Sequence, residues 1–117
     1  MDKKTIKEIL EKNNLNFKEK RWFISKLITL LSKYDKNEFI YPRELYWLYR
    51  NDKDYLYAVL DTLEENRMLK KHIILRCCRC GKEKIIPKNL LKGEEVICEE
   101  CEADNDDSDC MVAYEVL

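Results

Sequence analysis

Four of the six cysteines lie in two Cys-x-x-Cys pairs, Cys77 with Cys80 and Cys98 with Cys101, separated by seventeen residues. Two residues between ligands allow one tight turn to aim both sulfurs at a single ion. Redox pairs of this form occur singly before a helix of a βαβ unit, and this segment has neither feature. Because four thiolates leave no open coordination position, we expect one structural Zn²⁺ held by these residues.

The remaining chemistry-bearing residues give weaker signals. Cys78 adjoins Cys77, but its spacing to Cys80 is too short for the usual turn, and Cys110 opens a final apolar run. Both thiols are expected to pack, although exchange of Cys110 for one of the ligands stays open. His72, the single histidine, has no triad-like neighbours, so we predict neither an enzyme nor a small-molecule substrate.

Short strands must position the four ligands. Residues 83–87 and 93–97 are predicted to form a hairpin between the two cysteine pairs, and residues 110–117 a third strand. Gly81, directly after the second cysteine, permits the positive φ that such a turn often needs. The two cysteine pairs at the ends of strands resemble the zinc-ribbon family.

The residues before Cys77 predict a helical domain with short strands. Apolar periodicity and end signals predict helices over 2–12, 16–34, 42–50 and 54–66, and strands over 38–41 and 69–76. Asn16 is the expected N-cap of the second helix. Asn66 is expected to end the fourth helix by adopting the left-handed backbone conformation. The order of helices and strands over residues 39–75 resembles that of the winged-helix family, a variant of the helix-turn-helix. The fold class is therefore α+β, with a winged-helix domain at 1–75 and a zinc ribbon at 76–117.

Charge divides at the same place. Residues 1–76 carry 17 Lys and Arg against 12 Asp and Glu, whereas residues 77–117 carry 5 against 11. The first part thus has a net charge of +5 and the second −6, so the second should repel nucleic acid. The charged N-terminus lacks a signal-peptide core and no apolar run reaches membrane-spanning length, so we expect a cytoplasmic protein without a membrane partner.

The layout of the two predicted domains is similar to that of archaeal transcription factor E and the eukaryotic factor IIE alpha subunit. That resemblance implies a non-enzymatic factor that contacts nucleic acid or a larger assembly. The helix expected to read DNA, 54–66, contains four acidic residues and no basic one, which is unfavourable among phosphates. Basic residues that could instead contact nucleic acid are Lys18, Lys20, Arg21, Arg50 and Lys53.

Aromatic residues concentrate between positions 41 and 57, more than the leucines of this region leave room to bury. Tyr, Trp and Arg are enriched at interface hot spots, although stacking on bases or completion of a small core are alternatives. The expected partner-binding residues are Tyr46, Trp47, Tyr49, Arg50 and Tyr57. We therefore expect an interaction subunit or adaptor of a larger protein complex, with a DNA-binding transcriptional regulator as the alternative.

Overall fold

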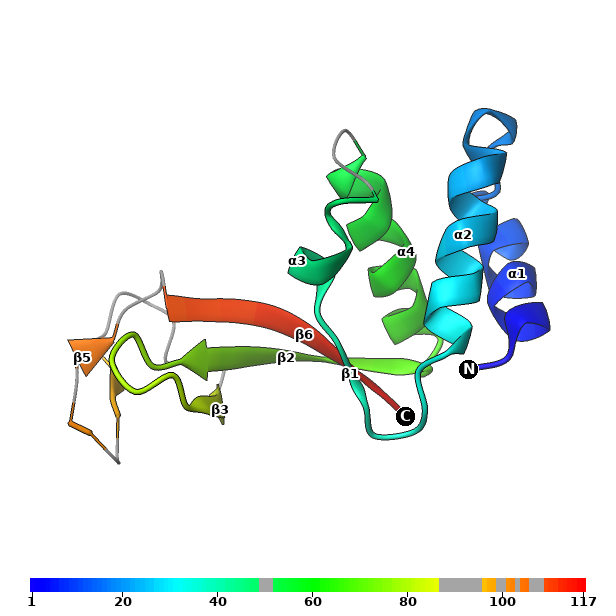
Figure 1. The fold of residues 1–117 in the computed structure, drawn as a ribbon. Coiled ribbons are helices and arrows are strands. Elements are labelled where there is room, and N and C mark those ends of the chain that lie inside the picture. Colours follow the sequence, from blue (N-terminus) through cyan, green and yellow to red (C-terminus); the bar gives the residue numbers. More distant parts are fainter. Residues whose placement is uncertain (49–51, 87–95, 99–100, 103, 106–108) are drawn as a thin grey trace. The chain divides into compact units, whose positions relative to one another are not determined.

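The computed structural model describes residues 1–48, 52–86, 96–98, 101–102, 104–105 and 109–117. The chain is a small α+β protein with an antiparallel sheet (Figure 1). It divides into two compact units, of which the first contains residues 1–71 and 114–117 and the second residues 72–113.

The first unit contains the helices. They are α1 (Lys3–Lys12), the 3-10 turn η1 (Lys18–Lys20), α2 (Arg21–Ser32), α3 (Pro42–Leu45) and α4 (Lys53–Glu65). Asp2 caps α1, because its carboxylate accepts a hydrogen bond from the Lys4 N–H at 3.4 Å. The residues of α4 at i, i+3, i+4 and i+7 from Leu56 are all fully buried, as their spacing predicts. Helix α1 packs against both α2 and α4.

Two predicted helices are shorter than expected. The helix predicted from Asn16 begins instead as the 3-10 turn η1, and α2 starts only at Arg21. In η1 the Lys20 N–H donates to the Phe17 carbonyl at 3.1 Å, and the Lys20 ammonium forms an ion pair with Asp52. The helix predicted over 42–50 ends at Leu45, where a 3.0 Å bond from the Leu48 N–H to the Leu45 carbonyl continues it only as a turn.

The main sheet has the strand order β1-β6-β2-β3. Its strands are β1 (Phe39–Ile40), β2 (Leu69–Arg76), β3 (Glu83–Ile86) and β6 (Cys110–Val116). In the first unit, Phe39 pairs with Glu115; in the second, Ile73 pairs with Ile86. A separate two-stranded sheet joins β4 (Val96–Ile97) to β5 (Asp104–Asn105).

The predicted hairpin between residues 83–87 and 93–97 lies partly outside the described residues, which omit 87–95. Strand β3 pairs with β2, and β4 pairs with β5. The tight turn after Cys77 returns the chain directly onto β2, and an Arg76–Glu83 ion pair stabilises the first register position of that pairing. The last strand, β6, pairs with β1, so it is not confined to the cysteine-bearing segment.

Candidate metal centre

The first cysteine pair is held by a tight turn between β2 and β3. The Gly81 N–H donates to the Cys77 carbonyl at 3.0 Å, and the Cys77 N–H donates to the Lys82 carbonyl at 2.9 Å. Gly81 has a φ of 75°, the left-handed conformation that glycine adopts without steric cost. The sequence correctly predicted this role for Gly81.

The second cysteine pair forms an equivalent turn. The Glu102 N–H donates to the Cys98 carbonyl at 2.8 Å, the same four-residue spacing as Gly81 and Cys77. Glu102 has a φ of 59° although it is not glycine. Its position after the Cys-x-x-Cys pair, equivalent to that of Gly81, was the signal that could have identified it.

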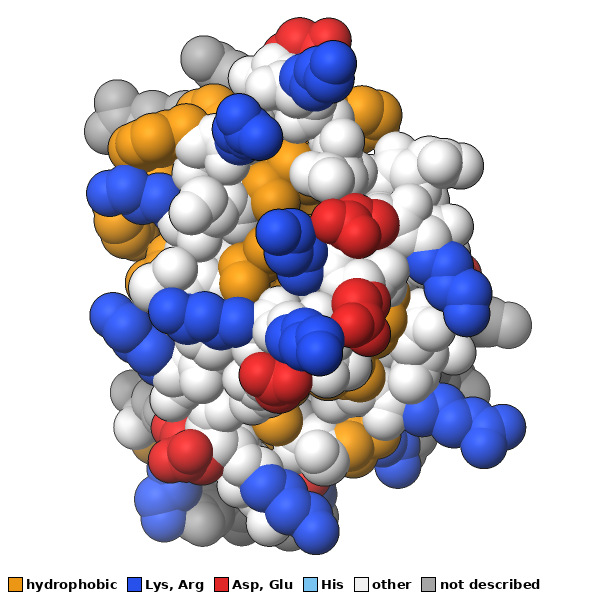
Figure 2. Space-filling model, turned by 90° about the vertical axis from the view of Figure 1, so that its right-hand side faces the viewer, with side chains coloured by type: hydrophobic (Ala, Val, Ile, Leu, Met, Phe, Trp, Pro, Cys, Tyr) orange, Lys and Arg blue, Asp and Glu red, His pale blue; other side chains and the backbone are white. Residues whose placement is uncertain are grey.

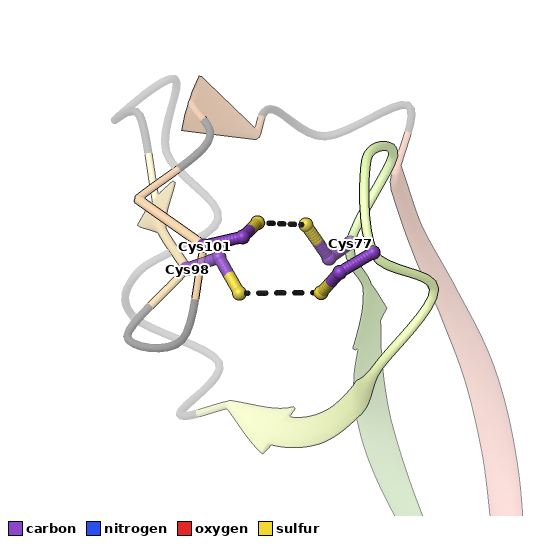
Figure 3. Close-up of side chains that lie close together, drawn as sticks. Cys77, Cys98 and Cys101 are labelled. Carbon is purple, nitrogen blue, oxygen red and sulfur yellow. Dashed lines mark hydrogen bonds between the residues drawn. The ribbon is translucent and has the colours of Figure 1, made fainter.

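These two turns bring together the four cysteines that the sequence singled out. The Sγ atoms of Cys77, Cys80, Cys98 and Cys101 all lie within 4.8 Å of one another. The Cys77–Cys101 pair is separated by 3.4 Å and the Cys80–Cys98 pair by 3.7 Å, and Figure 3 shows Cys98 and Cys101 on the opposite side of the site from Cys77. Tetrahedral zinc with 2.3 Å Zn–S bonds implies sulfur separations of about 3.8 Å. The cluster therefore has the dimensions to hold a metal ion.

The electrostatics around Cys77 favour a metal-binding thiolate. Its side chain is only 3% exposed. Hydrogen bonds from the backbone N–H groups of Cys80 and Arg79 lower the pKa of Cys77 to about 6, against the opposing effect of burial. Because the thiolate is the form that binds metals, this turn prepares the first ligand for coordination near neutral pH.

Asn105 is a supporting residue that the sequence reasoning missed. It is 1% exposed, and among the described residues it is the one buried polar side chain that is not a tyrosine or cysteine. Its Nδ2 lies 3.7 Å from the Cys77 sulfur, and its Oδ1 accepts a 3.0 Å bond from the Cys78 N–H. Its side chain therefore links β5 to the first cysteine turn and orients one ligand.

The other cysteines and the histidine lie outside the four-sulfur cluster. Cys78 is exposed, and its thiol points to the Asp104 carbonyl at 3.7 Å. Cys110 is the first residue of β6 and is partly buried. His72 lies on β2. The geometry thus favours the original ligand set over the exchange of Cys110.

The predicted partner-binding residues differ in exposure. Trp47 is 65% exposed, the largest value among the exposed large hydrophobic residues of the described chain. Tyr46 and Tyr57 are half-buried, with their hydroxyls 2.5 Å apart, and burial followed by this hydrogen bond raises the pKa of Tyr57 to about 12. Tyr49 and Arg50 lie outside the described residues.

The predicted nucleic-acid-binding residues have different surroundings. Lys18 and Arg21 line a groove beside α1 and α2. Lys20 is engaged with Asp52 and lies 5.3 Å from the Tyr55 ring, whereas Lys53 lies 4.6 Å from the Tyr46 ring. The fifth candidate, Arg50, is outside the described residues.

Comparison with known proteins gives no relative: no family model, curated protein or solved structure matches this chain. None of the helices in the described ranges has the length and apolar character needed to cross a membrane.

Proposed function

We propose that this chain is a non-enzymatic interaction subunit or adaptor of a larger intracellular protein complex. In this proposal a winged-helix unit carries the contact surface, and a four-cysteine zinc ribbon with one structural Zn²⁺ accompanies it. The all-thiolate donor set supports zinc, because soft sulfur ligands in a four-coordinate cluster suit this ion. A structural rather than catalytic metal fits a cluster in which all four positions are taken by protein ligands.

The exposure of Trp47 is the observation that carries the interaction role. A tryptophan that is 65% exposed leaves a large apolar ring in water beside the half-buried Tyr46. Tryptophan is the residue type most typical of energetic hot spots, and it contributes when a partner covers it. A ring required only for the internal core would be buried, as Tyr55 is at 7% exposure.

DNA reading through α4 receives less support. Asp61, an acidic residue of α4, accepts a 2.6 Å hydrogen bond from the Tyr114 hydroxyl and forms an ion pair with Lys71 at 3.2 Å. Such contacts give Asp61 a structural use, and Lys53 is the one basic residue that α4 offers to phosphates. The transcriptional regulator therefore remains the second candidate.

The test is affinity capture of partners with Trp47→Ala, using Trp22→Ala as a matched control at a second exposed tryptophan. We expect Trp47→Ala to weaken association by 2 kcal/mol or more, about thirtyfold, because a covered anchor is lost. The melting temperature of the isolated protein should stay nearly unchanged. A large fall in stability with association intact would show that Trp47 serves the fold and would refute the proposed surface.

A further inference from the structure

A groove of about 900 Å³ lies along α1 and α2 in the first unit. Its lining is strongly basic: five cationic side chains face it, against the single carboxylate of Glu11. The cations are Lys3, Lys4, Lys7, Lys18 and Arg21. Figure 2 shows this side of the molecule, where Lys and Arg side chains, with Asp and Glu among them, lie around patches of hydrophobic surface.

The floor of this basic groove is apolar. Phe17 lines it with a ring that is 41% exposed, and the largely buried Ile24 and Ile28 of α2 line it beside Ser25 and Thr29. The groove thus combines apolar surface with a rim of positive charge, and any ligand that fits must satisfy both.

We propose that this groove binds an acidic amphipathic segment of a partner protein. An amphipathic helix would place apolar side chains on Phe17 and the α2 floor, while Asp and Glu along its edges meet the lysines of α1. Helix α1 has 10 residues. At 1.5 Å per residue it extends about 15 Å, enough to match a bound helix of about ten residues. The inference rests on the proposed adaptor role and names the chemistry of one partner, but it uses a surface other than Trp47.

Nucleic acid is the competing occupant, and the lining is less suited to it. Phosphates would satisfy the lysines but leave the apolar floor without a matching group. Binding of single strands normally adds aromatic rings on which successive bases stack. In the described lining Phe17 is the one aromatic residue, and its ring already packs on Tyr55 with centres 5.9 Å apart.

The experiment selects random twelve-residue peptides displayed on phage against the full-length, metal-loaded protein. A selected peptide is then labelled, and its affinity is measured for three proteins: wild type, Lys4→Glu/Lys7→Glu and Lys33→Glu/Lys36→Glu. The second pair reverses the same charge at exposed positions that do not line the groove. A further variant, Lys18→Gln/Arg21→Gln, removes charge from the other side of the groove. It replaces Lys4→Glu/Lys7→Glu in the comparison if that variant does not fold.

The expected selection is rich in Asp and Glu, with apolar residues three or four positions apart. Affinity should fall at least tenfold in Lys4→Glu/Lys7→Glu, or in Lys18→Gln/Arg21→Gln, and less than twofold in the control. The proposal is overturned if no acidic peptide is enriched or if the groove variants bind it normally. It is equally overturned if only oligo(dT) or a duplex binds with this lysine dependence, or if the lysines instead support self-association. Trp47→Ala should leave peptide binding unchanged, so loss of the groove and loss of the Trp47 surface can be told apart.

Discussion

The two cysteine turns place different residues in the same backbone conformation. Gly81 and Glu102 both have positive φ, at 75° and 59°, and both donate to the carbonyl of the first cysteine of their pair. A side chain at such a φ costs about 1–2 kcal/mol relative to glycine. The second turn therefore carries a conformational cost that the first avoids, and the shared hydrogen-bond pattern maintains it.

A side chain placed at position 81 and a glycine placed at position 102 should change metal affinity in opposite directions. A Cβ at Gly81 would meet nothing within 4 Å, so Gly81→Ala tests the backbone conformation alone. We expect Gly81→Ala to weaken metal binding by about 1 kcal/mol and Glu102→Gly to strengthen it by a similar amount. Competition with a chromophoric zinc chelator measures both. Unchanged affinity in both variants would show that the left-handed positions do not limit the site.

The ligand set itself predicts the metal content of single variants. Wild-type protein purified without added metal should contain close to one equivalent of zinc, and Cys98→Ser should lose it, because three remaining thiolates no longer close a tetrahedral site. Cys110→Ser should keep its metal, since Cys110 lies outside the four-sulfur cluster. Elemental analysis of the wild type, Cys98→Ser and Cys110→Ser measures the zinc content of each protein. Retention in Cys98→Ser together with loss in Cys110→Ser would reassign the ligands.

Helix α4 is attached to the sheet through Asp61. Its Oδ1 accepts from the Tyr114 hydroxyl at 2.6 Å, and burial followed by this hydrogen bond raises the pKa of Tyr114. The hydroxyl therefore stays a donor through neutral and mildly alkaline pH. Asp61→Ala should lower the free energy of unfolding by about 1–2 kcal/mol, toward the low end because the carboxylate is half exposed.

Urea denaturation of metal-loaded protein measures the effect of Asp61→Ala. Glu65→Ala is the control, an exposed acidic residue at the end of the same helix. We expect the control to change stability by less than about 0.5 kcal/mol. Equal effects of the two substitutions would mean that helix charge, and not the contact with Tyr114, determines the result.

Elements with a strong local pattern were predictable from sequence. The strand over 69–76 matches β2, and the helix over 54–66 matches α4 to within one residue at each end. At the end of α4, however, Arg67 and not Asn66 adopts the left-handed conformation, with a φ of 61°. The preference of asparagine for that conformation was overridden because the Met68 N–H bonds to the Leu63 carbonyl at 3.0 Å, which fixes the turn one residue later.

Features that depend on distant residues were not predictable. Residue spacing alone placed the four ligands together, since each pair needs only a local turn. The described partners of β3 and β4, by contrast, are β2 and β5, which the sequence did not predict. Asn105 escaped notice for the same reason, because it reaches Cys77 only after β5 has formed.

The two units differ in how they are stabilised. Of the buried hydrophobic residues in the described chain, seventeen belong to the first unit and five to the second. Residues 72–113 also have an acidic excess, with 6 Lys and Arg against 10 Asp and Glu, a net charge of −4 before any thiolate is counted. The described part of the second unit thus has little apolar burial to offset chain entropy and self-repulsion, so we expect this unit to depend on a metal bound by the four cysteines.

Removing the metal should therefore unfold the second unit and spare the first. Structural zinc contributes about 10–16 kcal/mol of apparent binding free energy in small zinc domains. After chelation we expect amide protection to be lost across residues 72–113, while the far-UV signal of the helices remains largely intact. Hydrogen exchange and circular dichroism on the same sample measure the two responses.

The helices keep their packing because their buried residues, from Ile6 in α1 to Leu63 in α4, belong to the first unit and do not include a cysteine ligand. Loss of the helical signal in the same transition would show that the two units fold as one cooperative body.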